Sequence, residues 1–307
     1  MAFSHALVTG GAGFIGSHLT HALLTRGHLV TVLDNLSVGR RDAVPDAARF
    51  VHGDIRDESA VTDALHGVDC VFHLAAQVTI RGSFDRFYQD LDTNVMGTAR
   101  LLEALDPGVI KWFVLASSMA VYADAQAPEP VAESYTTQPM SPYGVGKLAA
   151  EGVAHHILEA RAIPMTTMRY FNTFGPGQTY TPYVGVITIF VTRLLRGEPP
   201  IIFGDGEQQR DFVHVADIVD GTLAGPMRTS GTYNLGTGRG TSLNELAKML
   251  TVRLAPHLAP VHAPAPAGEL RHSVADIDSA RKFLGYQPAR TLEGEIGAVI
   301  ADIRGRR

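Results

Sequence analysis

The chain is poor in several features that mark particular classes of protein. Its 307 residues include one cysteine, Cys70, so no disulfide can form within the chain. Acidic side chains (31) outnumber lysine and arginine (26), and the net charge of −5 argues against a surface for nucleic acid or anionic membranes. No apolar run reaches the ~18 residues of a membrane span, and the N-terminus lacks the basic start of a signal peptide. We therefore expect a cytoplasmic protein whose partners include neither nucleic acid nor membrane.

Neither the single cysteine nor the paired histidines indicate a reactive or metal-binding site. Cys70 lies in the mostly apolar run Val68–Ala76, which indicates a buried, inert thiol. His18 and His21 are one helical turn apart and His155 and His156 are adjacent, but no acidic or cysteine partner stands at a ligand spacing. We expect no metal site.

The first half of the sequence alternates strand-like and helix-like segments. The strand-like runs are His5–Thr9, Leu29–Asp34, Arg49–Gly53, Cys70–Ala75, Trp112–Ser117 and Ile163–Tyr170. The helical runs between them are Gly13–Arg26, Glu58–Leu65, Thr93–Leu105 and Pro142–Ala162. This alternation predicts an α/β fold with a doubly wound parallel sheet of the Rossmann type.

The rhythm breaks after Arg169. A loop-like stretch over 172–185 precedes a predicted helix at Val186–Arg196, and a strand and a helix follow within Arg210–Ala224. Ser242 and Glu245 have capping-box spacing at the start of another helix. We expect a nucleotide-binding domain over residues 1–170, to which 205–235 return. Residues 171–204 and 236–307 should form a smaller mixed α/β substrate-binding part.

A glycine-rich turn follows the first predicted strand and opens the first predicted helix. It contains Gly10, Gly11, Gly13, Phe14, Ile15 and Gly16. Gly11, Gly13 and Gly16 match Gly-x-Gly-x-x-Gly, and Gly10, Gly13 and Gly16 match Gly-x-x-Gly-x-x-Gly; both are common spacings of a dinucleotide site. A side chain at these glycines would keep a diphosphate from the backbone amides.

A carboxylate follows the glycine turn at a further characteristic distance. Asp34 ends the second strand 18 residues after Gly16, near the spacing of the group that binds the adenosine ribose, and Asn35 follows it. A carboxylate there repels a 2′-phosphate, so NAD is favoured over NADP, although Arg40 and Arg41 stand close by. Asp54 and Ile55 end the third strand, where the adenine edge is expected.

An acid–base set is predicted from three residues. Tyr143 and Lys147 are four residues apart on a predicted helix and share a face, and Ser117 and Ser118 end the fifth strand at the ligand-binding edge of the sheet. A nearby lysine and a cationic nicotinamide would both stabilise a tyrosine phenolate. We expect Tyr143 to act as the base toward a substrate hydroxyl while NAD takes a hydride from the same carbon.

Taken together, these motifs resemble the extended short-chain dehydrogenase/reductase family, and within it the nucleotide-sugar epimerases and dehydratases. The resemblance covers nearly the whole chain. It is carried by Gly10-x-x-Gly13-x-x-Gly16, His73-Leu74-Ala75-Ala76, Ser117-Ser118, Tyr143-x-x-x-Lys147, Arg169-Tyr170-Phe171-Asn172, and Gly204-Asp205-Gly206 through Arg210-Asp211-Phe212. Gly146 and Ala123 depart from it, because serine or threonine often precedes the lysine and glycine usually follows Tyr122.

The resemblance also implies roles for individual residues. Asp34 and Asp54 would bind the adenosine part of NAD, and Leu74, Ala75, Ala76, Asn94 and Tyr170 would lie along the cofactor. Ser118 would contact the sugar O4, while Asn172 and Arg210 would hold the substrate diphosphate. The usual second basic group is absent before Gly268-Glu269, and Arg271 stands nearby as its replacement. The family also implies a homodimer formed by helices such as Thr93–Leu105 and Pro142–Ala162.

The position after Ser118 separates the possible reactions. Dehydratases resemble one another in carrying an acidic pair there, which eliminates water across C5 and C6, whereas this chain has Met119 and Ala120. We therefore favour NAD-dependent 4-epimerisation of a UDP-hexose, such as UDP-glucose or UDP-galactose or an N-acetyl or uronic relative. In the segment from Gln77 to Ser83, Arg81 could pair with a sugar carboxylate. The alternatives are a nucleotide-sugar dehydratase or reductase and, less favoured because Tyr143 and Lys147 are both present, a non-catalytic NAD-binding protein.

Overall fold

A seven-stranded parallel sheet forms the centre of the molecule. The computed structural model describes residues 3–125, 129–180, 185–265 and 270–306. The strand order is β10-β6-β5-β4-β1-β2-β3. The strands are β1 (His5–Thr9), β2 (Leu29–Asp34), β3 (Arg49–His52), β4 (Cys70–His73), β5 (Trp112–Ser118), β6 (Met165–Tyr170) and β10 (Gly231–Leu235).

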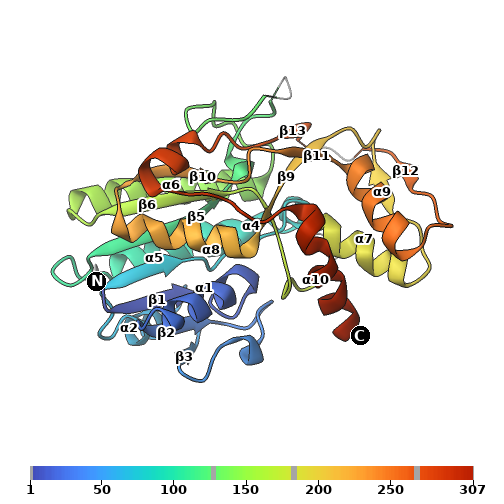
Figure 1. The fold of residues 1–307 in the computed structure, drawn as a ribbon. Helices are drawn as coiled ribbons and strands as arrows, with labels where there is room; N and C mark the ends of the chain where they lie inside the picture. Colours follow the sequence, from blue (N-terminus) through green and yellow to red (C-terminus); the bar gives the residue numbers. More distant parts are fainter. Residues whose placement is uncertain (1–2, 126–128, 181–184, 266–269, 307) are drawn as a thin grey trace.

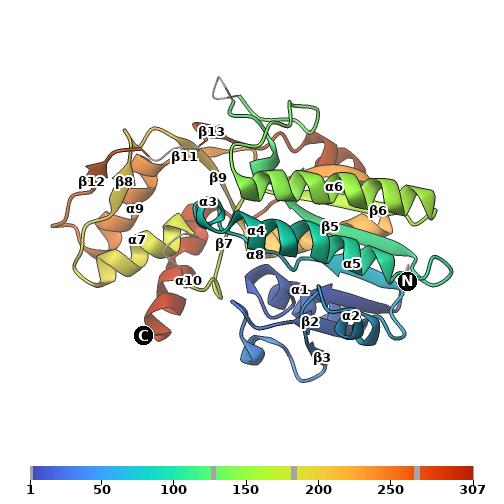
Figure 2. The ribbon, with the colours of Figure 1, turned by 180° about the vertical axis from the view of Figure 1, so that it is seen from behind.

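Helices cover both faces of this sheet. Helices α1 (Phe14–Thr25) and α8 (Val215–Ala224) lie on the face seen in Figure 1. The opposite face, seen in Figure 2, carries α2 (Glu58–Ala64), α5 (Thr98–Glu103) and α6 (Pro142–Ala160). The central strands are buried from both sides, as their runs of β-branched and aliphatic residues require, and an apolar core fills each side. The predicted doubly wound fold is confirmed.

The strand order reverses beside β1, which pairs with both β2 and β4. Ligands of open α/β sheets bind outside the carboxyl ends of the strands at such a reversal. The glycine-rich turn after β1 lies at this point. The fold thus places that turn, the end of β4 and the end of β5 along one edge.

A smaller mixed part lies beside the carboxyl edge of the sheet, on the right in Figure 1. Strand β9 (Gln209–His214) pairs with β7 (Asn172–Phe174), β11 (Gly240–Ser242) and β13 (His272–Ser273), and β8 (Ile201–Phe203) pairs with β12 (Val261–Ala263). Helices α7 (Val186–Leu195), α9 (Leu243–Leu254) and α10 (Leu292–Gly305) surround a third apolar core. The chain returns to the main sheet through α8 and β10, whereas β9 belongs to the smaller part.

Short elements complete the chain. Helices α3 (Gly82–Asp85) and α4 (Phe87–Leu91) lie beside α6, and a π-helical turn, η2 (Asp92–Gly97), joins α4 to α5. The 3-10 turns are η1 (Arg41–Ala43), η3 (Met119–Val121) and η4 (Gly225–Met227), and a second π-helical turn is η5 (Ala280–Leu284). The single helix predicted over Thr93–Leu105 is therefore two elements, since η2 widens its first turns.

Three local expectations can be compared with these elements. The capping box of α9 is confirmed, because Ser242 Oγ accepts from Glu245 N (3.1 Å) and Glu245 Oε2 accepts from Ser242 N (2.8 Å). Cys70 is buried, and burial raises the pKa of its thiol. In the described ranges no helix has both the length and the apolar character needed to cross a bilayer, and no three His, Cys, Asp or Glu side chains are grouped to hold a metal ion.

Candidate active site

A cavity of about 740 Å³ opens at the carboxyl edge of the main sheet and extends to the smaller part. Most residues predicted for the site line it. These are Gly10, Gly13, Phe14, Ile15, Gly16, Asp34, Asn35, Asp54, Ile55, Leu74, Ala75, Ala76, Gln77, Arg81, Ser117, Ser118, Tyr143, Lys147, Tyr170, Asn172 and Arg210. Asn94 and Arg271 are not among the lining residues.

The turn between β1 and α1 needs glycine for reasons of space and backbone geometry. Gly10 has φ of +72°, and a Cβ atom on it would lie 2.8 Å from Ala75 N. A Cβ atom on Gly16 would lie 2.1 Å from Gly10 O. The turn therefore lies tight against β4 and presents the N-terminus of α1 to the cavity. Backbone amides and a helix N-terminus together suit a diphosphate.

Two carboxylates lie at the end of the cavity formed by β2 and β3. Asp34 is buried and accepts hydrogen bonds from Ala12 N (3.0 Å) and Leu36 N (2.8 Å), which fix it beside the glycine turn. Asp54 accepts from Asn35 Nδ2 (2.8 Å) and pairs with Arg56, and this guanidinium holds the pKa of Asp54 far below its usual range. Both side chains are thus held as hydrogen-bond acceptors at the place expected for an adenosine group.

The two arginines that favoured NADP are held by other partners. Arg40 pairs with Asp42, and the guanidinium of Arg41 lies over the Phe50 ring, 4.8 Å from its centroid. Neither is among the residues that line the cavity. The cavity wall near Asp34 is instead formed by Ser37, Val38 and Gly39. The described residues fit a dinucleotide without a 2′-phosphate.

The predicted acid–base residues meet in the cavity. Tyr143 opens α6, where Ser141 Oγ caps the helix by accepting from Gly144 N (3.1 Å). The backbone N–H of Tyr143 donates to Ser83 Oγ (3.1 Å) from α3. The Tyr143 hydroxyl lies close enough to Ser118, at the end of β5, for that side chain to act on its pKa. Lys147 lies one helical turn further and is buried.

The protein's own residues shift the pKa values of Tyr143 and Lys147. Burial raises the pKa of Tyr143 to about 12, with Ser118 acting in the opposite direction. Burial lowers the pKa of Lys147 to about 8, although Glu151 and Asp90 oppose that change. The expected phenolate near neutral pH therefore does not arise from the described side chains alone, and a positively charged cofactor ring beside Tyr143 would act in the required direction.

A buried network that the sequence reasoning missed ties α6 to the sheet. Glu151 binds Arg169 of β6 through both oxygens (3.0 and 2.7 Å) and also accepts from Ser117 Oγ. Arg169 donates further to Tyr122 Oη (2.9 Å). Tyr143, Lys147 and Glu151 are each four residues apart, so the spacing that revealed the first pair could also have revealed the third residue.

Asn94 lies one layer behind the cavity wall. Its Oδ1 accepts from Gln77 N (2.8 Å) and its Nδ2 donates to Gln77 O (3.1 Å) and to Asp90 Oδ1 (3.1 Å). The side chain therefore holds the backbone of the segment after β4. Asn94 is not among the described residues that line the cavity, and its expected place along the cofactor stays a prediction.

The end of the cavity formed by the smaller part carries a few polar and cationic side chains among mostly apolar ones. Asn172 on β7 lines it, and its Nδ2 is buried with no hydrogen-bond partner among the described residues. Arg210 on β9 is also buried and lines the cavity. Across the cavity, the Arg81 guanidinium lies 4.4 Å from the centroid of the Phe203 ring. An unpartnered amide and an arginine in one cavity suit an anionic ligand.

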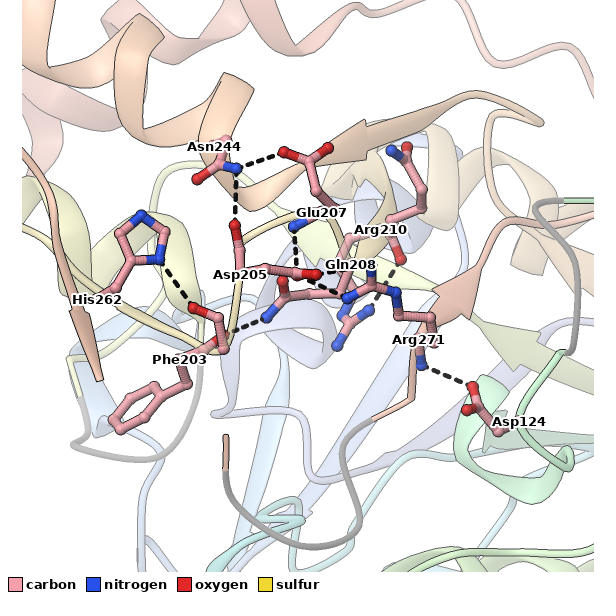
Figure 3. Close-up of polar contacts among 11 residues, drawn as sticks. Asp124, Phe203, Asp205, Glu207, Gln208, Arg210, Asn244, His262 and Arg271 are labelled. Atoms are coloured by element: carbon pink, nitrogen blue, oxygen red, sulfur yellow. Dashed lines mark hydrogen bonds and ion pairs between the residues drawn. The ribbon is translucent and has the colours of Figure 1, made fainter. Parts of the chain in front are cut away.

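Arg271 is not among the cavity-lining residues and binds Asp205 and Asp124 instead (Figure 3). Both guanidinium nitrogens contact Asp205 (2.6 and 2.9 Å), and the backbone N–H of Arg271 donates to Asp124 Oδ1 (2.6 Å). Asn244 Nδ2 binds the same loop at Asp205 O (2.9 Å). Arg271 therefore braces the loop between β8 and β9 in this structure. The Gly268-Glu269 pair used to predict its role lies outside the described residues.

Among the described residues, no acidic side chain lines the cavity next to Ser118. Met119 lines it and Ala120 follows in the buried turn η3, and the carboxylates among the described lining residues are Asp34 and Asp54, at the other end. A proton at O4 could therefore be moved by Tyr143, but the described residues place no second acid–base pair there. This arrangement suits reversible oxidation of one carbinol carbon.

Comparisons with known proteins agree with this geometry. Residues 6–236 match the NAD dependent epimerase/dehydratase family. A UDP-glucose 4-epimerase from Mycolicibacterium smegmatis is 36% identical over 310 residues, which cover 98% of each chain.

Two solved structures are similar over the whole fold. The UDP-glucose 4-epimerase of Thermotoga maritima, solved with UDP-glucose, has a TM-score of 0.94 and 35% identity, covering 98% of this chain and 99% of that one. The UDP-glucose 4-epimerase of Thermus thermophilus, solved with NAD, has a TM-score of 0.92 and 32% identity, covering 99% and 100%.

Proposed function

This chain belongs to the NAD dependent epimerase/dehydratase family and is a carbohydrate epimerase that uses NAD, and we propose that it interconverts the C4 epimers of a UDP-hexose. The observation that carries this proposal is the meeting of Tyr143, Lys147 and Ser118 beside Met119 in one cavity. Those side chains can move one proton at one oxygen. Water elimination needs a further acid and base, so a dehydratase is the less favoured alternative.

The proposed roles at the cofactor end follow from the contacts. The glycine turn and the N-terminus of α1 would hold the diphosphate, and Asp34 would accept from the adenosine ribose. Leu74, Ala75 and Tyr170 would line the path to the nicotinamide. When bound, NAD would supply the hydride-transfer chemistry by which C4 is oxidised and then reduced from the opposite face.

The chain's own residues would control the proton and the position of the sugar. Tyr143 takes the O4 proton as C4 is oxidised and returns it as C4 is reduced, while Ser118 hydrogen bonds to O4. The ammonium group of Lys147 stabilises the phenolate. Asn172 and Arg210 would bind the diphosphate, which leaves the sugar to turn over between the two steps. Arg271 would contribute to that end only after leaving Asp205.

The sugar itself is proposed from the comparisons and the cavity together. The similar enzymes named above are UDP-glucose 4-epimerases, and the cavity has the apolar Met119 next to Ser118. We therefore propose UDP-glucose and UDP-galactose as the first substrates to test. Arg81 lies over Phe203, so a uronate could pair with it only in competition with that ring.

The test is an assay of the purified protein with UDP-glucose, UDP-galactose, their N-acetyl and uronic relatives, and the corresponding dTDP- and GDP-sugars. Proton NMR of the products should show a C4 epimer of a UDP-hexose. A product lacking water would support the dehydratase alternative. Turnover of no sugar, with NAD bound, would support a non-catalytic protein.

We also propose that the enzyme is a homodimer through the outer surface of α4, η2 and α6. Exposed apolar side chains gather on these adjacent elements: Phe87, Tyr88, Met96 and Val145 are 58%, 74%, 60% and 48% exposed. Contiguous apolar surface of this kind is typical of an interface. The elements lie together on the face of Figure 2.

A further inference from the structure

The buried carboxylate of Asp90 has an unusual environment. It lies on α4 and is only 2% exposed. Its Oδ1 accepts from Asn94 Nδ2 (3.1 Å), but its Oδ2 has no hydrogen-bond partner among the described residues. By contrast, Glu151 and Asp217 are also buried and each pairs with an arginine. A buried carboxylate without a cation in contact is unfavourable, which calls for an explanation.

Asp90 faces the helix that carries the acid–base residues. Helix α4 packs against α6, and the two approach at Gly146. A Cβ atom on Gly146 would lie 3.3 Å from Asp90 Oδ1 and 3.6 Å from Asn94 Cβ. Gly146 immediately precedes Lys147 and stands three residues after Tyr143. The missing side chain lets the carboxylate approach the turn of α6 that joins these two residues.

The other charged groups around Asp90 are compensated or exposed. On η2, Asp92 pairs with Arg56 (2.7 Å), and Asp85 and Arg86 at the junction of α3 and α4 are exposed. On α6, Glu151 forms an ion pair with Arg169. On β4, His73 lies between the hydroxyls of Thr9 (2.7 Å) and Thr98 (2.8 Å), and burial lowers its pKa to about 3, so it is neutral. The remaining charged group that acts on Asp90 is Lys147, and the charge of Asp90 acts on Lys147 and on the Tyr143 hydroxyl.

The electrostatic effects have definite signs. Burial raises the pKa of Asp90 to about 6, so its carboxylate is ionised above that pH. The charged carboxylate raises the pKa of Lys147, against the effect of burial, and also raises the pKa of Tyr143. Removing the charge while keeping the shape should therefore lower both pKa values.

We propose that Asp90 is a positioning residue of the reaction, whose charge keeps Lys147 in its ammonium form and whose contact with Asn94 steadies the Gln77 wall of the cavity. This inference rests on the proposed epimerase function. It gives the buried carboxylate a role in proton transfer without contact with the substrate. It also explains why an uncompensated charge is tolerated behind the site.

The first test is the pH dependence of the epimerase rate in Asp90→Asn. The amide keeps the shape and an oxygen acceptor for Asn94. We expect both limbs of the pH–rate profile to move to lower pH, by about half a unit to one unit. Asp85→Asn, which removes an exposed carboxylate nearby, should leave both limbs in place. If both limbs of the Asp90→Asn profile stay at the pH values of wild type, the proposal is overturned, whatever the overall rate of the variant.

A second test uses stability and does not depend on activity. The folded-state pKa of Asp90 is raised above its ordinary value, so the wild-type protein loses stability as pH rises through about 4 to 6. Asp90→Asn should therefore unfold at a higher urea midpoint than wild type at pH 8 and at a similar midpoint at pH 4. A variant less stable than wild type at pH 8 would make Asp90 a structural anchor and contradict the proposal.

The two hypotheses fail in different ways. If wild type converts no nucleotide sugar, the proposed function fails before any variant is compared. If wild type is active and the Asp90→Asn profile does not move, the role of Asp90 fails while the function stands.

Discussion

Tyr143 is the side chain on which the proposed chemistry depends most directly. It lines the cavity together with Ser118, which acts on the pKa of its hydroxyl. Tyr143→Phe removes the proton carrier but little volume, so we expect the epimerase rate to fall by about 10² to 10⁴-fold. Steady-state kinetics and the NAD content of the purified variant measure this. Full activity in Tyr143→Phe would contradict the mechanism.

Lys147 gives a prediction of pH dependence. Burial lowers the pKa of its ammonium group to about 8, so that the group loses its proton as pH rises through that value. Stabilisation of the phenolate should then weaken, and the rate should decline above about pH 8. Lys147→Arg carries a guanidinium that keeps its charge, so its slower reaction should lack this decline. An unchanged alkaline decline in the variant would assign it to another group.

At the scale of residues, site residues can be predicted from the sequence where their spacing along a helix decides which way their side chains point. Tyr143 and Lys147 share a helical face because four residues make about one turn. The position of Arg271 could not be predicted in this way, because its partner Asp205 is 66 residues distant and lies on a different loop. Asn94 lies in the π-helical turn η2, and no local sequence pattern distinguishes such a turn from an α-helix.

At the scale of elements, the junction of α6 with β5 and β6 determines the geometry of the site. The ion pair of Glu151 and Arg169 is buried, with side chains 11% and 8% exposed, and it anchors the helix one turn beyond Lys147. Glu151→Gln would leave a buried guanidinium without its counter-charge. We expect a loss of about 3–5 kcal/mol in the free energy of unfolding.

Urea unfolding at pH 7 tests the role of this ion pair against a matched surface pair. Asp63 pairs with Arg49 at the surface, where the side chains are 57% and 44% exposed. Asp63→Asn should change the free energy of unfolding by less than about 1 kcal/mol. Equal effects of the two substitutions would show that α6 is not anchored by Glu151.

Some helices and strands can be predicted from the sequence, and others cannot. The parallel sheet follows from the alternation of apolar strands with helices, and α9 from its capping box. Helices α3 and α4 were missed because four and five residues are too few to show a helical period. Strands β7, β8 and β11 to β13 are two or three residues long and are defined by partners elsewhere in the chain. Such short strands carry no alternation of their own.

At the scale of the whole molecule, we propose that two copies of the chain associate through one apolar face. The surface of α4, η2 and α6 should bury Tyr88 and Met96 in a dimer. Tyr88→Glu combined with Met96→Glu should therefore yield a monomer in light scattering. Val252→Glu changes a side chain that is also exposed (65%), but on α9 of the smaller part, and should leave the dimer intact. A double variant with the mass of wild type would place the interface elsewhere.

The central claim is that C4 of a UDP-hexose is oxidised and reduced within one cavity while Tyr143 moves only the O4 proton. Proton and deuterium NMR of UDP-glucose carrying deuterium at C4, incubated with the enzyme in ordinary water, tests this most directly. The account predicts UDP-galactose that retains deuterium at C4, because the electrons and their hydrogen return to the same carbon. Loss of the deuterium to water, or a product that has lost water, would contradict it.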